Sequence, residues 1–297
     1  MQVDEAPPLG RRYEVDGRGL VLHRSGSGGP AVVFLPGAGL VGLDYLELQQ
    51  RAAELTTSVL YDRGGTGWSD PVALPRGATE VTDELRALLT AAAVPAPYLL
   101  VGHSLGAFYA RRYAQRFPGE VAGLLLLDPG HEDILDFLPP EAAELNERMK
   151  PDPERLPDLT PEQLEASRVQ LDRLYARWPE KVRGPLVEHH LTHWRTGVHE
   201  STNFDTDLYA ELRAGGPLPD VPLIVYTAMG RNPYWAQFAS EEFMARAHDG
   251  IRAMHAALAA SVPRGEQRIL DDAPHQYLHV QHPDEVLHAI RELSDAS

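Results

Sequence analysis

The stretch PYLLVGHSLGAFYARRYAQRF, residues 97–117, decides the fold. It opens with a short apolar run, which is typical of a strand buried on both faces of a sheet, and it closes with a helical pattern. Residues 102–106, GHSLG, stand between the two and match the pattern G-x-S-x-G. A strand, a sharp turn and a helix around that pattern predict a nucleophile elbow, with Ser104 exposed at the carboxyl edge of a parallel sheet.

The two glycines of this turn have a physical reason. The chain reverses so sharply at Ser104 that Gly102 and Gly106, two positions away on either side, have no room for side chains. The helix that follows places its positive dipole end at the serine, which favours negative charge developing there. The alternative is a glycine-rich turn in which Ser104 only caps the helix, but the strand and helix on either side favour the elbow.

Short apolar strands alternate with helical patterns over most of the chain, which predicts βαβ units and a largely parallel sheet with helices on both faces. The opening segment instead resembles a hairpin. The expected strands are residues 11–15, 20–25, 31–35, 58–62, 98–102, 123–128, 223–227 and 267–270. The expected helices are residues 42–54, 78–93, 104–117, 241–261 and 283–293.

Residues 131–215 break this alternation. They contain several helical patterns and no convincing strand, and they begin with a proline-rich, acidic stretch. We therefore expect a helical cap inserted into an α/β core made of residues 1–130 and 216–297. The apolar side chains spaced along residues 164–178 argue against the alternative, a long solvated excursion.

Composition and charge exclude several classes of protein. The chain has 297 residues, no cysteine and a net charge of −16. Without cysteine there are no disulfides, thiolate nucleophiles or cysteine-based zinc sites. The negative charge disfavours nucleic acids and anionic membranes as partners. Residues 1–10 lack the pattern of a signal peptide, and the longest apolar stretch, residues 121–127, is too short to span a bilayer. We expect a cytoplasmic protein, as a monomer or homodimer, that acts on a small molecule.

Acyl-transfer chemistry at Ser104 needs two backbone donors for an oxyanion. The N–H of Leu105, directly after the serine, supplies the first in an elbow of this type. The second is expected from the small residues after the strand of residues 31–35, where the chain reads PGAG. Ala38 is the preferred donor and Gly39 the next, because small residues let backbone N–H groups approach a ligand closely.

The general base is expected to be a histidine near the end of the chain. The segment LDDAPHQYLHVQHPDEV contains His275, His279 and His282. His275 comes first, in the loop directly after the last strand, where its side chain can reach the carboxyl edge of the sheet. His279 and His282 lie closer to Pro283, the expected start of the last helix. We therefore predict His275 as the base, with His279 as the alternative.

These pieces together resemble the α/β-hydrolase superfamily over essentially the whole chain. LPGAG, residues 35–39, resembles the family's oxyanion segment, and YDRGGTGWSD, residues 61–70, resembles its strand-to-turn motif. GHSLG is similar to the family's elbow, and HQYLHVQHPDEV, residues 275–286, to its histidine loop. The resemblance implies an α/β-hydrolase fold and a capped bacterial serine hydrolase without cofactor. A serine nucleophile argues against the epoxide hydrolase and haloalkane dehalogenase branches.

The acid of the triad departs from the usual pattern. Most relatives carry it after the strand that corresponds to residues 223–227, where this chain reads AMGRNPYW. A minority of the superfamily takes the acid from the preceding strand, which ends here at Asp128. Adjacent parallel strands end side by side, so a carboxylate there can approach the same histidine. We therefore predict Asp128 as the acid. The weaker candidates are Asp271, Asp272, Asn232, Glu132 and Asp133, and Asp128 could instead only cap its strand.

Several other residues are candidates for contact with the substrate. Gly39 and His103 flank the predicted oxyanion hole and nucleophile, and aromatic side chains are gathered in the cap and in the loop after residue 227. Those chosen as pocket-lining are Trp178, Trp194, Tyr234 and Trp235, which would suit a mid-sized apolar substrate. The alternative is that most of them pack the cap against the core. A metal site at His189, His193 and His199 is not expected, because such a site needs further ligands and a supporting shell.

The sequence therefore predicts a hydrolase that cleaves an ester, a lactone or a related carbonyl compound through an acyl-enzyme. A C–C bond hydrolase acting on a diketone-like substrate would use the same triad. A member of the fold that binds a ligand, or cyclises or isomerises it, without hydrolysis is a third possibility. Substrate class does not follow from the fold.

Overall fold

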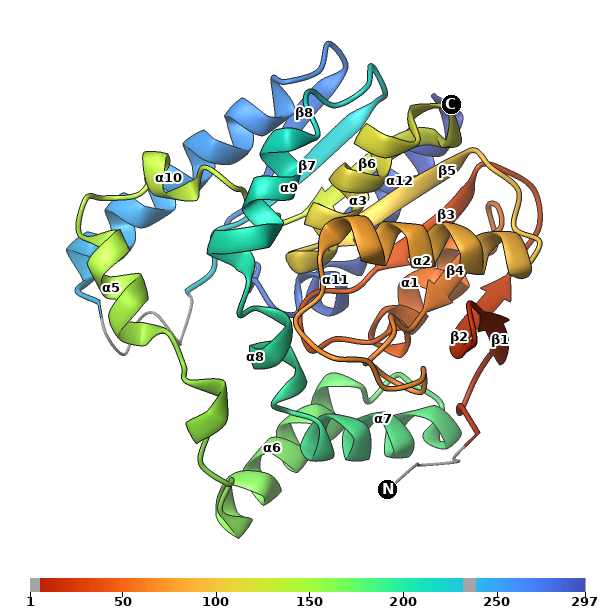
Figure 1. Ribbon diagram of the computed structural model, residues 1–297, viewed down its shortest axis with the longest axis horizontal. Helices are drawn as coiled ribbons and strands as arrows, with labels where there is room; N and C mark the ends of the chain where they lie inside the picture. The colour runs from red at the N-terminus through yellow and green to blue at the C-terminus, as the bar shows by residue number, and fades with distance from the viewer. Residues whose placement is uncertain (1–5, 232–238, 297) are drawn as a thin grey trace.

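The sheet has eight strands in the order β1-β2-β4-β3-β5-β6-β7-β8 (Figure 1). The structure is a computed structural model that describes residues 6–231 and 239–296. The strands are β1 Arg11–Val15, β2 Arg18–Ser25, β3 Ala31–Leu35, β4 Ser58–Tyr61, β5 Tyr98–His103, β6 Val121–Leu127, β7 Leu223–Ala228 and β8 Gly265–Leu270. β1 and β2 form the expected hairpin, and β2 pairs antiparallel with β4. From β4 to β8 every pairing is parallel.

Helices cover both faces of the sheet, as the apolar strands predict. The core helices are η1 Gly42–Tyr45, α1 Leu46–Ala52, α2 Ala78–Ala91, α3 Leu105–Arg116, η2 Pro118–Glu120, α10 Glu241–Ala259, α11 Leu278–Gln281 and α12 Pro283–Asp295. Side chains of β3, β5 and β6 alternate between two apolar clusters, because successive residues of a strand point to opposite faces. One cluster includes buried residues of α2, α3 and α10, and the other those of α1 and α12.

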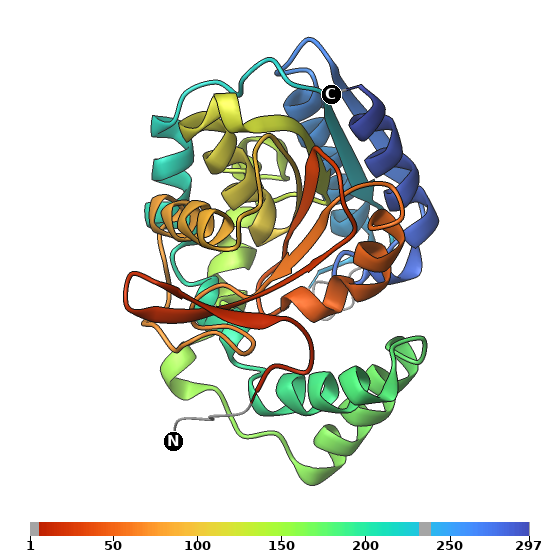
Figure 2. The ribbon, with the colours of Figure 1, turned by 90° about the vertical axis from the view of Figure 1, so that its right-hand side faces the viewer.

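A helical insertion, residues 129–222, separates β6 from β7. Its elements are α4 Ile134–Phe137, α5 Ala142–Met149, η3 Pro153–Arg155, α6 Pro161–Leu174, α7 Glu180–Thr192, α8 Thr196–Glu200, η4 Phe204–Leu208 and α9 Tyr209–Ala214. It contains no strand, in agreement with the sequence pattern. In both ribbon views the pair α6 and α7 lies to one side of the sheet (Figures 1 and 2).

Buried polar contacts attach this insertion to the core beside β3. The carboxylate of Asp44, fully buried in η1, accepts hydrogen bonds from the hydroxyl of Tyr175 and from Nε2 of His190, the latter at 2.8 Å. The indole N–H of Trp178 donates to the carbonyl of Leu43 at 2.8 Å. The insertion is therefore docked on the segment that follows β3. Among the described helices, none combines the length and the apolar character needed to cross a bilayer.

Candidate active site

The turn at Ser104 has the geometry of a nucleophile elbow. β5 ends at His103 and α3 begins at Leu105, and Ser104 between them has φ 50° and ψ −113°. A Cβ added to Gly106 would lie 1.9 Å from the carbonyl oxygen of Leu35, and one added to Gly102 would lie 2.7 Å from backbone atoms of α3. Both contacts are far below van der Waals distance, so only glycine fits at either position. The sequence prediction for the two glycines is confirmed.

The structure brings Ser104, His275 and Asp128 together at the carboxyl edge of the sheet. Nε2 of His275 lies 3.1 Å from Oγ of Ser104, and Nδ1 lies 2.5 Å from Oδ2 of Asp128. The register explains the placement, because His103 of β5 pairs with Leu127 of β6 and the serine and aspartate follow these residues. The expected contact between Asp128 and His275 is present.

Burial, hydrogen bonding and charge together shift the pKa values of His275 and Asp128. Burial on its own would lower the pKa of His275, but the hydrogen bond and charge of Asp128 outweigh it and raise the pKa above 6.5. Burial would raise the pKa of Asp128, and the bond and charge of His275 hold it below 3.8 instead. The second carboxylate oxygen of Asp128 accepts the N–H of Ala228 at 2.9 Å. The pair therefore favours an ionised aspartate that orients the imidazole.

The rival bases do not contact Ser104. His279 is buried, its ring stacks on Tyr45 at 4.0 Å between centroids, and neither ring nitrogen has a hydrogen-bond partner among the described residues. Burial lowers its pKa to about 4. His282 lies 3.6 Å from Asp272 and 3.8 Å from Glu285. Of the three histidines, only His275 is hydrogen-bonded to the serine.

The rival acids are engaged elsewhere. Glu132 forms a two-bond ion pair with Arg111, with both distances 2.7 Å, and Asp133 pairs with Arg213 at 3.0 Å. The side chain of Asp272 is almost fully exposed. No interaction of Asp271 with His275 is found in the described part of the chain, and Asn232 lies outside it.

Within the described residues, the two expected oxyanion donors have no hydrogen-bond partner, whereas the reserve donor has one. Leu105 is the first residue of α3, where a backbone N–H has no acceptor within the helix. The N–H of Ala38 has no hydrogen-bond partner among the residues described. The N–H of Gly39 donates to Oε2 of Glu200 at 2.8 Å. The N–H of Gly39, the predicted reserve donor, is therefore already occupied by a carboxylate of the insertion.

These observations agree with a family match. The model of the Alpha/beta hydrolase family fits residues 32–289, which include the elbow, the insertion and the histidine loop. The chain belongs to this family. The fold class predicted from the sequence, an α/β-hydrolase fold, is confirmed.

Curated relatives of this alpha/beta hydrolase carry no assigned activity. The uncharacterized protein YqjL of Bacillus subtilis (strain 168) is 34% identical over 128 residues, which are 43% of this chain and 51% of YqjL. The uncharacterized protein YbdG of the same strain is 28% identical over 123 residues, 41% of this chain and 38% of YbdG. The chain thus spans about half or less of the length of these relatives.

Several solved structures of hydrolases share the fold of this chain. Epoxide hydrolase VrEH1 from Vigna radiata has a TM-score of 0.70 and 16% identity, covering 97% of both chains. A thermophilic esterase from Thermogutta terrifontis has a TM-score of 0.62 and 20% identity over 95% of this chain and 96% of its own. Est816, described as an N-acyl homoserine lactone degrading enzyme, has a TM-score of 0.55 and 18% identity, over 95% and 99%. At these identities the likeness concerns the fold alone.

Two predicted substrate contacts of this hydrolase have structural roles instead. Both ring nitrogens of buried His103 are engaged: Nε2 donates to the carbonyl of His275 at 2.7 Å, and Nδ1 accepts from the hydroxyl of Tyr45 at 2.8 Å. His103 therefore holds the loop of the predicted base. Trp178 is buried, packs edge-on against Tyr175, and docks the insertion on the core. The sequence could not separate these roles, because lining and packing positions have the same apolar pattern.

The remaining predicted contacts divide into two groups. Trp194 is half-buried, and the guanidinium of Arg195 lies 4.6 Å from the centre of its ring. Tyr234 and Trp235 lie outside the described residues.

His189 and His193 stack at 4.4 Å between ring centres, and the described residues contain no group of side chains suited to a metal ion.

Several residues that support the site were not predicted from the sequence. His255 of α10 donates from Nε2 to the carbonyl of Pro129 at 2.8 Å, which fixes the turn directly after Asp128. Buried Arg63 contacts the loop of residues 36–40, which carries the predicted donor Ala38, and Glu200 reaches the same loop from α8. Arg63 lies within residues 61–70, which resemble the strand-to-turn motif of the family, and this resemblance was the sequence signal that could have identified it. Nothing in the pattern of the insertion distinguished Glu200 from its many exposed carboxylates.

Proposed function

We propose that this alpha/beta hydrolase is a serine hydrolase that cleaves a carboxylic ester, a lactone or a related carbonyl compound through an acyl-enzyme. The observation that carries the proposal is the hydrogen-bonded chain from Ser104 through His275 to Asp128 at a strained elbow. A serine held against a histidine, which is itself oriented by a carboxylate, is the arrangement that activates a hydroxyl for attack on a carbonyl.

The geometry gives each group one task. Oγ of Ser104 attacks the carbonyl carbon while Nε2 of His275 takes the hydroxyl proton. Asp128 accepts the N–H at Nδ1 and stabilises the imidazolium that forms. The N–H groups of Leu105 and Ala38 stabilise the oxyanion of the tetrahedral intermediate. His275 then gives its proton to the leaving oxygen, and a water activated by the same histidine hydrolyses the acyl-enzyme.

The predicted nucleophile and base are accessible from outside the protein. Ser104 is partly exposed, and the His275 side chain is 42% exposed while that of Asp128 is 10% exposed. The imidazole is thus accessible and the acid is covered. We propose that residues 131–215 act as a cap over this opening, and that Trp194 faces an apolar part of the substrate.

The experiment is active-site labelling with a fluorophosphonate probe at neutral pH, followed by mapping of the modified peptide. We expect one adduct, on Ser104, in the wild-type protein and none in the His275→Ala variant. His282→Ala is the matched control, because this histidine lies seven residues on in the same region and should leave labelling intact. A wild-type protein that is not labelled would favour a binding protein or another non-hydrolytic member of the fold.

Turnover then separates the two hydrolytic alternatives. Turnover should be measured with p-nitrophenyl esters of increasing chain length, with lactones and with diketones. Each rate is divided by the number of active sites, which is given by the amount of labelled Ser104. Turnover of esters or lactones supports the proposal. Cleavage of diketones alone would assign the triad to C–C bond hydrolysis.

A further inference from the structure

The oxyanion loop, residues 36–40, has three of its four N–H groups and two of its carbonyls in hydrogen bonds. The carbonyls of Pro36 and Gly37 accept from Arg63 at 2.6 and 3.0 Å, and the carbonyl of Gly37 also accepts the N–H of Leu40 at 3.2 Å. The N–H of Gly37 lies 3.4 Å from the hydroxyl of Tyr45, and that of Gly39 donates to Glu200. Among the described residues, the Ala38 N–H is the loop donor left without a partner.

This loop lies directly against the elbow. A Cβ on Gly106 would come within 2.7 Å of the Pro36 carbonyl oxygen, and one on Gly37 within 3.5 Å of that of His103. Small shifts of the loop therefore move the Ala38 N–H relative to Ser104. Losing one oxyanion donor costs roughly 100- to 1,000-fold in turnover, so the position of this loop matters to catalysis.

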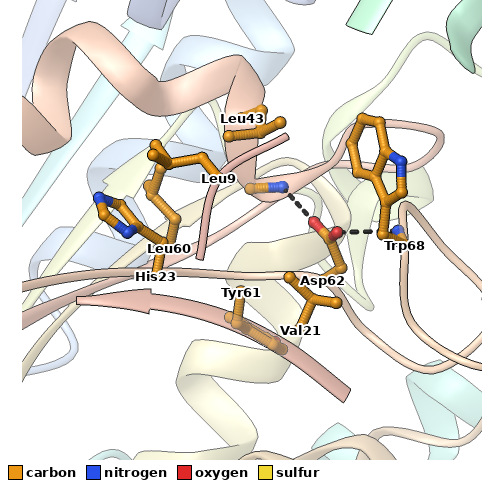
Figure 3. A pocket seen from close by; sticks show the side chains of 9 residues that line it. Leu9, Val21, His23, Leu43, Leu60, Tyr61, Asp62 and Trp68 are labelled. Atoms are coloured by element: carbon orange, nitrogen blue, oxygen red, sulfur yellow. Dashed lines mark hydrogen bonds between the residues drawn. The ribbon is translucent and has the colours of Figure 1, made fainter. Parts of the chain in front are cut away.

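The turn that follows β4 fixes the position of Arg63. The carboxylate of Asp62 accepts the N–H groups of Gly42 and Trp68 at 2.9 and 3.0 Å, beside a small cavity lined by Trp68, Tyr61 and Leu43 (Figure 3). The next residue, Arg63, is 1% exposed. It contacts the loop through two of its nitrogens and Glu200 through Nε and Nη2, at 3.1 and 2.8 Å.

Glu200 contacts the loop from the insertion. It is 4% exposed and lies at the end of α8, in the insertion. The same helix also approaches the loop through backbone atoms, because Gly39 has φ +71° and a Cβ added to it would lie 3.1 Å from Cα of Gly197. The loop is thus clamped between Arg63, which belongs to the core, and α8, which belongs to the insertion.

Only a carboxylate satisfies both partners of Glu200. Oε1 accepts from Arg63 and Oε2 accepts the N–H of Gly39, so both oxygens face donors. An amide of the same shape offers one acceptor and one N–H₂ group, and the N–H₂ group would face a donor. In a buried site such a donor–donor contact leaves one group unpaired.

We propose that Glu200 is a positioning residue for the oxyanion loop. It holds Gly39 and Arg63 so that the Ala38 N–H remains free beside Ser104, and it makes the oxyanion hole depend on the docked position of the insertion. This inference rests on the proposed serine hydrolase function. Glu200 itself does not touch the reacting atoms and acts through the loop.

The first test is Glu200→Gln, assayed with a p-nitrophenyl ester. We expect kcat per labelled active site to fall roughly 10- to 100-fold with KM changed less than about twofold, because oxyanion stabilisation acts in the transition state. Glu211→Gln is the matched control. Glu211 joins α9 of the insertion to Thr79 of the core through one backbone N–H at 2.6 Å, which an amide oxygen can also accept.

A second variant keeps the test valid if Glu200→Gln does not fold. Gly197→Ala leaves the Arg63–Glu200 pair intact, but its methyl group would lie 3.2 Å from Cα and N of Gly39 and push the loop. We expect kcat to fall several-fold, again with little change in KM. Gly119→Ala, whose added methyl group meets nothing within 4 Å, is its control.

The outcomes distinguish this inference from the proposed function. A wild-type protein that is not labelled on Ser104 overturns the function. Normal labelling of the wild type, with unchanged kcat per labelled site in Glu200→Gln and Gly197→Ala, overturns the role of Glu200. A loss of folded protein alone would lower the number of labelled sites and leave kcat per site unchanged, which also contradicts the positioning role.

Discussion

Asp128 is the residue on which the account of the site depends. Its backbone has φ +44°, in the left-handed region that aspartate and asparagine tolerate better than most residues. That conformation, directly after β6, turns the carboxylate towards His275 rather than along the strand. The Ser-His-Asp arrangement is therefore complete, although residues 229–231 contain no acidic side chain.

The raised pKa of His275 predicts a pH profile. The base must be neutral to accept a proton, so kcat/KM should fall as pH drops through the pKa of His275. Because Asp128 raises this pKa, the acid limb should have its midpoint above 6.5 in the wild type. In Asp128→Asn the charge is gone, and the midpoint of any residual activity should move to lower pH. An acid limb unmoved by this substitution would contradict the coupling.

The strand ends and glycines around the site could be predicted from sequence, because they follow from local chemistry. The G-x-S-x-G turn requires glycine for steric reasons, and Asp128 follows an apolar strand. The roles of His103 and Gly39 could not be predicted in this way. Each depends on a partner far along the chain, such as Glu200, 161 residues from Gly39. Local pattern carries no information about such a partner.

At the scale of elements, the elbow between β5 and α3 is a tightly constrained junction. The expected strands and helices of the core match the observed ones to within a few residues, because parallel strands buried on both faces are apolar runs with sharp limits. Residues 42–54 differ in detail, since they begin as the 3₁₀ helix η1 before continuing as α1.

Gly106→Ala should disrupt this junction. The added methyl group would lie 1.9 Å from the carbonyl oxygen of Leu35, so α3 must shift away from β3. We expect a loss of about 3 kcal/mol or more in the free energy of unfolding, measured by urea denaturation, together with loss of labelling at Ser104. Gly119→Ala, in open space, should change stability by less than about 0.5 kcal/mol. Equal stabilities would show that the elbow is not under this constraint.

At the scale of the whole molecule, the insertion is joined to the core by buried polar groups. Asp44 of η1 meets Tyr175 and His190 of the insertion, more than 130 residues away in sequence. The helical character of residues 131–215 could be predicted from their pattern. Their docking site could not, because it depends on which buried groups meet in three dimensions. Their action as a cap remains a prediction.

Tyr175→Phe should weaken this docking. It removes a hydrogen bond to a buried carboxylate, and bonds to charged groups contribute about 1.5–3 kcal/mol. We expect a loss of that size in urea denaturation, with faster proteolysis within residues 139–160. Tyr13→Phe is the control, since the hydroxyl of Tyr13 has no hydrogen bond in the described structure. Similar stabilities for the two variants would mean that Asp44 does not anchor the insertion.

The most direct test of the central claim is turnover of an ester by Asp128→Asn, per folded molecule. Asparagine suits the left-handed backbone at this position, so the fold should survive, as circular dichroism and the unfolding midpoint can verify. If Asp128 is the acid that orients His275, kcat should fall roughly 10,000-fold. A kcat within about tenfold of the wild type, in a folded protein, would contradict the assignment of β6 as the source of the acid.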